Sequence, residues 1–354
     1  MKILICLVLI NEVDSLFWEP LDSLILKGLE FSYAEKYKEA EFYFELAIRN
    51  YPESPIGYLY KAGLLDLYML DFETDVYEGT FYKLCDEAIM RSQRIRDRYG
   101  SDSAILALSY FTEGSAHAYK AIRKGRNKEY LSALNGGLKS VELLRKCIDI
   151  DSTIYDAYLP LGVFEFAMVK IPKAFRWVVP GDYSKDEALR KIELSIQKSK
   201  YIGILAKNAY VWVLSYDNQL DSALKVAQEL VELYPGSRTF RWTLSYVQRR
   251  SGNWKNALKN HEVILYLTLR DQPWNSYNIA LSLYYLSISS YITGDKRRAL
   301  FYAEACKNEM SEVREDRPEK NKILRVVTNL SSKLEKYEGK ELYVDPAGVE
   351  QYVP

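Results

Sequence analysis

Apolar residues recur at steps of three and four in the first part of the chain. That spacing places the apolar residues on one face of a helix, so it predicts two amphipathic helices, one with apolar positions from residue 21 to 31 and one from residue 37 to 51. Pro52 ends the second helix, because proline cannot continue a helix and disfavours helical geometry at Tyr51. The apolar positions are Leu21, Leu24, Ile25, Gly28 and Phe31, then Tyr37, Ala40, Phe44, Ala47, Ile48 and Tyr51.

Small residues mark the place where these two helices approach each other. Gly28 costs roughly 1 kcal/mol of helix propensity relative to alanine, so its position inside a helix needs a compensating reason. A close crossing supplies that reason, because the missing side chain lets a second helix come near. Ala40 and Ala47 are the small surfaces expected to face the crossing. The segment is therefore predicted to form an antiparallel helix hairpin.

The hairpin resembles a tetratricopeptide repeat. Its small, aromatic and proline positions stand where this family has them, whereas Leu24 replaces the tryptophan that the family often has. One such hairpin cannot bury its apolar face alone, so the resemblance implies that further hairpins stack on it. The residues that carry the resemblance are Gly28, Phe31, Ala40, Phe44, Ala47 and Pro52.

Later segments repeat the pattern of the second helix. Ala257 follows Ala223 after 34 residues, which is the period of the tetratricopeptide repeat. Ala299 follows Ala257 after 42 residues, so about eight residues are inserted, and we place them around residues 272–278 (QPWNSYN). Asn218, Asn253 and Asp295 are the predicted N-caps of the three second helices. The further positions that match are Ala227, Leu230, Pro235, Gly252, Trp254, Gly294 and Cys306.

The middle of the chain keeps helical periodicity but departs from the repeat pattern. It contains three further helix pairs between residues 56 and 198, with an irregular linker near residues 171–183. Ser184 and Glu187 form a capping box that restarts the helix after the linker. The central region also resembles, more faintly, the tetratricopeptide repeat protein 39 family, and no function is carried over from it. That resemblance rests on Gly162, Trp177, Gly181 and Asp182.

These patterns predict an all-α protein, a right-handed superhelical α-solenoid of antiparallel helix hairpins. The repeat array is expected over residues 16–312, followed by a capping helix over residues 313–338 and an extended tail over residues 339–354.

The first fifteen residues have the composition of a signal peptide. Lys2 precedes an apolar run from Ile3 to Ile10, which is too short to span a bilayer but fits the core of an export signal. This predicts a periplasmic or cell-envelope protein; the alternatives are a buried first helix and a cytoplasmic protein. No other stretch is long and apolar enough to cross a membrane.

Composition narrows the possible partners. The chain has 354 residues, and its 48 basic and 48 acidic side chains give no excess positive charge for binding nucleic acid. A hydrophobic content of 48% argues against disorder. The four cysteines, Cys6, Cys85, Cys147 and Cys306, show no paired spacing and are predicted to be core residues or, for Cys6, part of the signal peptide.

Residues suited to catalysis are scarce. The chain has two histidines, His117 and His261, and neither has a second histidine or a cysteine nearby in sequence for a metal or catalytic set. The sequence contains no nucleophile elbow, phosphate loop or zinc-protease motif. We therefore predict a protein that is not an enzyme and that needs no cofactor or metal ion.

The remaining candidate is a binding surface. The tetratricopeptide resemblance implies that one face of each first helix lines a concave groove. Aromatic residues and arginine, which anchor protein interfaces, are frequent there. The predicted function is a scaffold that binds another protein or a peptide in this groove. The alternative is a protein that binds a glycan or lipid on the aromatic face. Several of the rings could instead pack between helices. The predicted groove residues are Asn208, Trp212, Tyr216, Trp242, Tyr246, Arg249, Arg250, Tyr284 and Tyr291.

Overall fold

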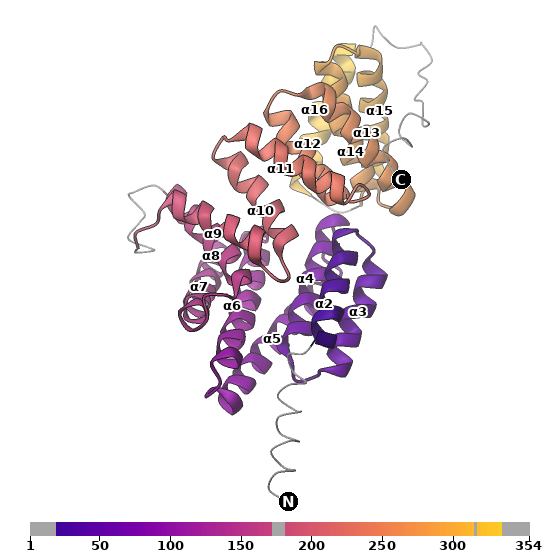
Figure 1. Cartoon of the computed structure of the whole chain (residues 1–354). Coiled ribbons are helices and arrows are strands. Elements are labelled where there is room, and N and C mark those ends of the chain that lie inside the picture. The colour runs from indigo at the N-terminus through magenta and orange to yellow at the C-terminus, as the bar shows by residue number, and fades with distance from the viewer. Residues whose placement is uncertain (1–18, 172–180, 315–316, 335–354) are drawn as a thin grey trace, which may run out of the picture. The chain divides into compact units, whose positions relative to one another are not determined.

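The computed structural model describes residues 19–171, 181–314 and 317–334, and all regular elements within those ranges are helices. The predicted all-α fold is confirmed. Figure 1 shows the helices in chain order. They are α2 (Glu19–Tyr33), α3 (Tyr37–Asn50), α4 (Pro55–Asp71), α5 (Glu78–Tyr99), α6 (Ser103–Arg126), α7 (Tyr130–Ile150), the short 3-10 helix η1 (Tyr155–Ala157), α8 (Tyr158–Lys170), α9 (Lys185–Lys198), α10 (Gly203–Tyr216), α11 (Leu220–Leu233), α12 (Arg238–Arg250), α13 (Trp254–Asp271), α14 (Ser276–Ile292), α15 (Lys296–Glu312) and α16 (Pro318–Leu334).

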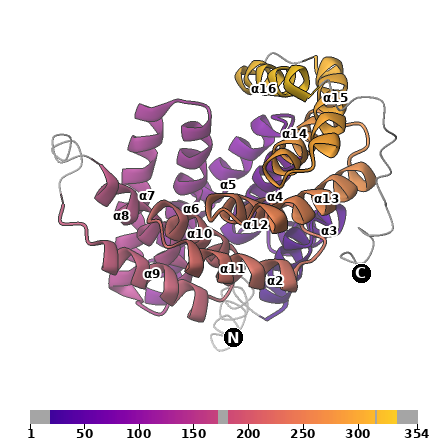
Figure 2. The same ribbon diagram turned by 90° about the horizontal axis from the view of Figure 1, so that it is seen from above.

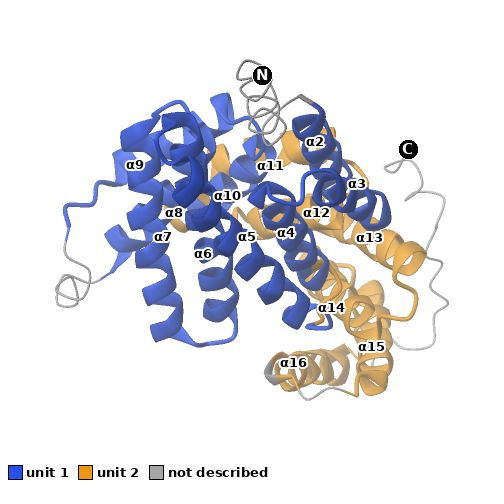
Figure 3. Cartoon of the chain, turned by 90° about the horizontal axis from the view of Figure 1, so that it is seen from below, with its two compact units in different colours: residues 1–70, 75–213 blue, residues 71–74, 214–354 orange. Residues whose placement is uncertain are grey.

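The chain folds as two compact units, coloured separately in Figure 3. The first unit contains residues 1–70 and 75–213. The second contains residues 214–354 together with the short segment 71–74, which is therefore part of the second unit although its sequence neighbours belong to the first.

In the first unit, α2 and α3 form the hairpin that opens the sequence. Gly28 is buried at the crossing, and a methyl group added to it would lie 2.5 Å from Cε1 of Phe44. Phe44, Ala40 and Ala47 are themselves fully buried in the same core. The predicted close crossing is therefore present, because the small residues let the two helices approach until the Phe44 ring fills the space between them.

We expect Gly28→Ala to lower the free energy of unfolding of the first unit by about 1–3 kcal/mol, because the added methyl overlaps a buried ring. In a Phe44→Leu background the same change should cost less, since the ring edge is gone. Urea unfolding of the four chains measures this coupling. Gly79→Ala on α5 is the control, because nothing lies within 4 Å of its added methyl group. An equal cost of Gly28→Ala in both backgrounds would contradict the close crossing.

The rest of the first unit is built from neighbouring helices packed in chain order. α6 packs on α7 and α8 on α9, as the sequence predicts, and α5 packs on α6. Figure 2, the view from above, shows α6 and α7 running beside each other. Cys85 and Cys147 are buried, unpaired core residues, and burial raises the pKa of each thiol to about 12. Ser184 is the N-cap of α9, because its Oγ accepts a hydrogen bond from the backbone N–H of Glu187 at 3.4 Å, whereas the Glu187 carboxylate, the other half of the predicted capping box, binds Arg190.

In the second unit, α12 pairs with α13, α14 with α15, and α16 packs on α15. Ala223, Ala257 and Ala299 are fully buried at the positions where small residues were predicted. The extra residues lie around QPWNSYN, as predicted, and they lengthen the two helices that meet there. α11 and α12 have 14 and 13 residues, whereas α13 and α14 have 18 and 17, so each of the latter is about one helical turn longer.

One of the three predicted N-caps makes its side-chain bond. Asp295 accepts a hydrogen bond from the backbone N–H of Arg298 and begins α15. Asn253 precedes α13 without a side-chain cap bond. The prediction for Asn218 is wrong, because it adopts the left-handed conformation with a φ of 63° in the turn before α11. Asparagine tolerates that conformation better than most residues, which explains its presence in the turn.

Several predictions fall on residues outside the described ranges. These are the signal peptide, most of the linker near residues 171–183, including Trp177, and the extended tail. The predicted capping helix corresponds to α16, which runs from Pro318 to Leu334. Among the helices of the described ranges, none is both long enough and apolar enough to cross a bilayer.

Candidate functional site

The predicted groove residues are divided between the two units. Asn208 and Trp212 lie half-buried on the part of α10 that belongs to the first unit. Tyr216, at the end of α10, belongs to the second unit and is exposed. The other six lie on α12 and α14 of the second unit, and these two helices contain the best-defined site.

Three of the predicted residues meet in one group, which we call the aromatic cluster. It consists of Trp242 and Arg249 from α12, His261 from α13, and Tyr284 and Tyr285 from α14. Tyr285 lies at its centre, with ring centroids 5.5 Å from Trp242 and 4.9 Å from Tyr284. The sequence analysis missed Tyr285. The Tyr284–Tyr285 doublet was the available signal, but only the packing of α14 shows which ring faces α12.

His261 packs inside the cluster as a neutral ring. It stacks on Tyr285 with an interplanar angle of 8° and is fully buried. Neither ring nitrogen has a hydrogen-bond partner among the described residues. Burial lowers the pKa of His261 well below its usual value, and the positive charge of Arg249 lowers that pKa further. The predicted structural role of this histidine agrees with its position.

Arg249 is fixed from two directions. Its guanidinium carbon lies 3.9 Å from the centroid of the Tyr285 ring, and its Nε donates a hydrogen bond to the backbone oxygen of Ser245. Its two terminal nitrogens have no protein partner among the described residues, and the side chain is only half-buried. The Arg249 side chain is therefore held in place, and its terminal nitrogens can still donate hydrogen bonds to a carboxylate of a ligand.

The remaining predicted residues stand apart from this cluster. Arg250 donates hydrogen bonds to the hydroxyl of Tyr246 and to the backbone oxygen of Ser215. Tyr291, near the end of α14, is exposed, and the Lys333 ammonium lies 6.0 Å from its ring centroid. The structure thus brings Trp242, Arg249 and Tyr284 together and leaves the other predicted residues in separate contacts.

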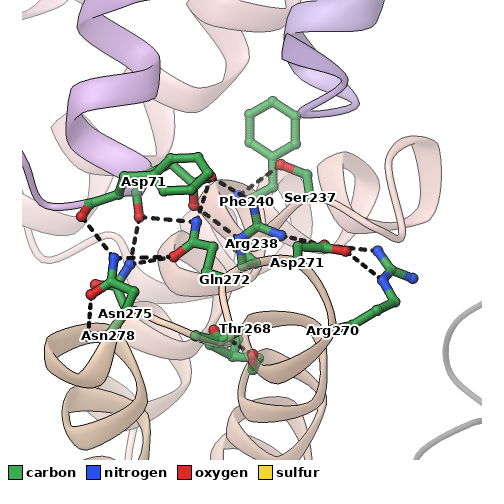
Figure 4. Close-up of polar contacts among 12 residues, drawn as sticks. Asp71, Ser237, Arg238, Phe240, Thr268, Arg270, Asp271, Gln272, Asn275 and Asn278 are labelled. Carbon is green, nitrogen blue, oxygen red and sulfur yellow. Dashed lines mark hydrogen bonds and ion pairs between the residues drawn. The ribbon is translucent and has the colours of Figure 1, made fainter. Parts of the chain in front are cut away.

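A second site surrounds Arg238 at the beginning of α12 (Figure 4). Its guanidinium binds the carboxylate of Asp71 in a two-pronged contact, with Nε to Oδ1 at 3.0 Å and Nη2 to Oδ2 at 2.6 Å. Its third nitrogen donates to Asp271. The Arg238 and Asp71 side chains are 4% and 3% exposed, so this ion pair is almost completely removed from water.

Three amide side chains bind the backbone that follows Asp71. Asn278 donates to the backbone oxygen of Asp71 at 2.7 Å, and Asn275 donates to that of Phe72 at 2.8 Å. Gln272 donates to the Asp71 carboxylate and accepts from Asn278 at 2.7 Å. These amides hold one another as well as the segment, which keeps them in place.

Arg317 completes the site. One of its terminal nitrogens donates to the backbone oxygen of Glu73 at 2.5 Å, and the other lies 3.5 Å from the Glu73 carboxylate. Its guanidinium carbon lies 4.2 Å from the centroid of the Tyr277 ring. We call the set that surrounds residues 71–74 the polar clamp; it consists of Arg238, Asp271, Gln272, Asn275, Asn278 and Arg317.

The sequence analysis missed the polar clamp, although a signal was present. Gln272, Asn275 and Asn278 lie in the segment QPWNSYN, where the spacing between repeats departs from 34 residues. We interpreted that departure as an insertion of about eight residues. The extra turns of α13 and α14 meet at this segment, and they are what bring the three amides to residues 71–74.

The first unit contains a pocket of about 210 Å³ beside α2 and the beginning of α10. Both of its acidic groups are already paired: Asp22 accepts from the Tyr201 hydroxyl and the Lys200 ammonium, and Asp156 accepts three backbone N–H bonds. Pockets for drug-sized ligands are usually about 300–1,000 Å³. This pocket is smaller, its two acids are bound within the protein, and it is not part of the predicted aromatic face.

Groups suited to metal binding or nucleophilic catalysis do not assemble in the described ranges. No three histidine, cysteine or acidic side chains come together there in a way that could hold a metal ion. Cys306, like the two cysteines of the first unit, is buried with a pKa raised to about 12.

Comparison with known proteins gives structural matches only. No protein-family model matches the sequence, and no curated protein matches it. One similar structure is YrrB, a TPR protein with an unusual peptide-binding site, with 15% identity, a TM-score of 0.41, and coverage of 62% of this chain and 93% of YrrB. Another is the C-terminal part of a TPR repeat-containing protein from Cytophaga hutchinsonii, with 14% identity, a TM-score of 0.43, and coverage of 83% and 96%.

At these identities and scores the two matches carry no argument about function. The predicted resemblance is confirmed by the chain itself, in the antiparallel hairpins and in the buried Gly28, Ala40, Ala223 and Ala257 at their crossings. The protein is an all-helical chain whose helix hairpins resemble tetratricopeptide repeats.

Proposed function

We propose that the protein is a non-enzymatic scaffold that binds another polypeptide on the face formed by α12 and α14 of the second unit. The observation that carries this proposal is Arg249. Its guanidinium is held over Tyr285 while its terminal nitrogens have no partner among the described residues. An arginine positioned in this way loses little conformational entropy when it binds a carboxylate, and aromatic residues with arginine are the usual anchors of protein interfaces.

The spacing of the residues along α12 suits an extended ligand. Arg238, Trp242 and Arg249 are separated by four and seven residues, so all three lie on one stripe of the helix. Arg238 and Arg249 are about 16 Å apart along the axis, because each residue adds 1.5 Å. About five residues of extended chain cover that length. The Arg249 end of this stripe can bind an acidic group of a short peptide, whereas the Arg238 guanidinium already binds Asp71 and Asp271.

Removing Arg249 should weaken partner binding without unfolding the second unit. We expect Arg249→Ala to reduce partner affinity about thirtyfold, the effect of losing an anchor of about 2 kcal/mol. Trp242→Ala should act in the same direction. The measurement is quantitative capture of specific partners from an extract by the full chain and by each variant, with circular dichroism as a check on folding.

Arg297→Ala is the matched control, because Arg297 is an exposed arginine on α15, outside the proposed face. It should retain every partner. If Arg249→Ala and Trp242→Ala also retain every specific partner, the α12–α14 face is not the binding surface.

The cellular location remains part of the proposal. The apolar run from Ile3 to Ile10 after Lys2 supports export to the cell envelope, and these residues lie outside the described ranges. Mass spectrometry of the mature N-terminus decides between the two locations. A mature chain that begins after about residue 15 supports export, whereas an intact Lys2 supports the cytoplasmic alternative.

A further inference from the structure

The polar clamp holds residues 71–74 in the way that a receptor holds a peptide. Three consecutive backbone oxygens, those of Asp71, Phe72 and Glu73, each accept a hydrogen bond from a clamp side chain. These contacts recognise the backbone itself, and so they do not depend on which side chains the segment carries. Backbone hydrogen bonds supply affinity in peptide recognition, and side-chain contacts supply selectivity.

The side-chain contacts select acidic residues. Arg238 binds the Asp71 carboxylate with two parallel hydrogen bonds, which is the most specific geometry available to an arginine. Arg317 approaches the Glu73 carboxylate as well as its backbone oxygen. The bound segment, Asp-Phe-Glu-Thr, therefore presents two acids to two arginines.

We propose that the polar clamp is a binding site for an acidic peptide segment, that residues 71–74 occupy it as an intramolecular ligand, and that a partner peptide of the same chemistry exchanges with them. This inference rests on the proposed function, because it names the chemistry of the polypeptide that the second unit binds. Residues 71–74 belong to the second unit.

The clamp is continuous with the face proposed above. Arg238 begins the stripe of α12 that continues through Trp242 to Arg249. On α14, Asn278 and Tyr285 are seven residues apart and so lie on one face of that helix. A partner longer than four residues can occupy the clamp with one acidic group and reach Arg249 with another. The contacts described above for residues 71–74 lie at the clamp end of this stripe.

The intramolecular ligand is bound under backbone strain. Glu73 has a φ of 52°, in the left-handed region that residues other than glycine seldom adopt. A separate peptide is free of the chain connections that impose this conformation. It can therefore compete, although the tethered segment has the advantage of a high effective concentration.

The test uses a fluorescent peptide with the sequence of residues 68–76, YMLDFETDV, and the full-length chain. The first variant, Asp71→Asn with Glu73→Gln, removes both carboxylates from the intramolecular ligand. It should bind the labelled peptide at least about tenfold more tightly than the unaltered chain, because the tethered competitor, present at an effective concentration on the order of millimolar, is weakened. Fluorescence anisotropy measures both affinities.

Two controls show whether the clamp is responsible. A peptide in which the first Asp and the Glu of YMLDFETDV are replaced by Asn and Gln should bind the first variant about tenfold more weakly, because it lacks the charges that the arginines select. Adding Arg317→Gln to the first variant should remove the gain in affinity for the acidic peptide. Adding Arg297→Gln, at an exposed position of α15, should leave that gain intact. Equal affinity for the acidic and neutral peptides would overturn the inference.

A second measurement covers the case in which the first variant does not fold. Hydrogen exchange of the unaltered chain, followed by mass spectrometry, should show faster exchange in residues 72–74 when excess acidic peptide is present. The neutral peptide should leave that exchange unchanged. Unchanged exchange with both peptides would overturn the proposed exchange.

The outcome for the clamp is separable from that for the proposed function. If Arg249→Ala abolishes capture of a partner while the acidic peptide fails both tests, the α12–α14 face binds a polypeptide but the clamp does not. If neither Arg249→Ala nor the peptide has an effect, both proposals fail.

Discussion

Arg238→Met should lower the free energy of unfolding of the second unit by about 3–5 kcal/mol, the range for breaking a buried ion pair by removing one partner. The Asp71 carboxylate is 3% exposed, and without Arg238 it loses the guanidinium that makes two hydrogen bonds to it. Gln272 still donates to it at 3.1 Å, but one neutral amide does not replace a guanidinium that makes two bonds. The cost comes mainly from the charge left behind.

Urea unfolding followed by tryptophan fluorescence measures this effect, because Trp242, Trp254 and Trp274 all lie in the second unit. Arg270→Met is the matched control. Arg270 also binds Asp271, but its side chain is 45% exposed, so its loss should cost only about 0–1 kcal/mol. Combining Arg238→Met with Asp71→Leu should restore much of the stability, since the buried charge is then gone. Equal costs for Arg238→Met and Arg270→Met would show that the clamp contributes little to stability.

Asp156→Ala should lower the free energy of unfolding of the first unit by about 2–4 kcal/mol, because it leaves three backbone N–H groups without their acceptor. Asp156, in η1, accepts hydrogen bonds from the backbone N–H groups of Lys200, Tyr201 and Ile202 at 2.9–3.1 Å. These three residues immediately precede α10. Hydrogen exchange at the three amides should accelerate in the variant, and unchanged exchange would show that Asp156 does not hold this turn.

The contribution of Asp156 to the free energy of unfolding of the first unit should change with pH in one direction. Burial raises the pKa of Asp156 above its ordinary value of 3.8, despite the three backbone N–H groups, which act to lower it. A raised folded-state pKa gives a contribution that is fully present below the unfolded pKa and is lost as the pH rises through the folded pKa. The stability of the wild-type chain relative to Asp156→Asn should therefore fall as the pH rises from about 3.8. A relative gain by the wild type over that range would show that the hydrogen bonds outweigh burial.

The aromatic cluster shows where sequence reasoning about the site succeeded and where it stopped. Trp242, Arg249 and Tyr284 are recognisable from their residue types and their places on first helices. Tyr285 and His261 complete the cluster because α13 and α14 turn those side chains toward α12. Periodicity gives the face of one helix, but a rotation of about 100° between neighbouring residues is enough to exchange Tyr284 for Tyr285 as the central ring.

The polar clamp could not be predicted for a different reason. Residues 71–74 and 272–278 are about two hundred positions apart, and no local pattern connects them. Asp71 resembles an ordinary acid at a helix end, and QPWNSYN resembles a polar turn. Only the fold shows that the carbonyl groups at the end of α4, which lack partners within the helix, are bound by amides from a turn far away in sequence.

The sequence by itself determined the helices, their pairing into hairpins and the buried small residues at the crossings. These follow from local rules, since the helical period decides which side chains share a face, and proline, glycine and capping residues decide where each helix ends. Tertiary structure alone decided the division into two units, the assignment of residues 71–74 to the second unit, and the partners of Arg238 and Arg249. The reason is physical: a buried charge takes whichever oppositely charged group the packing brings within reach, and packing joins residues whose distance along the chain carries no information about their contact.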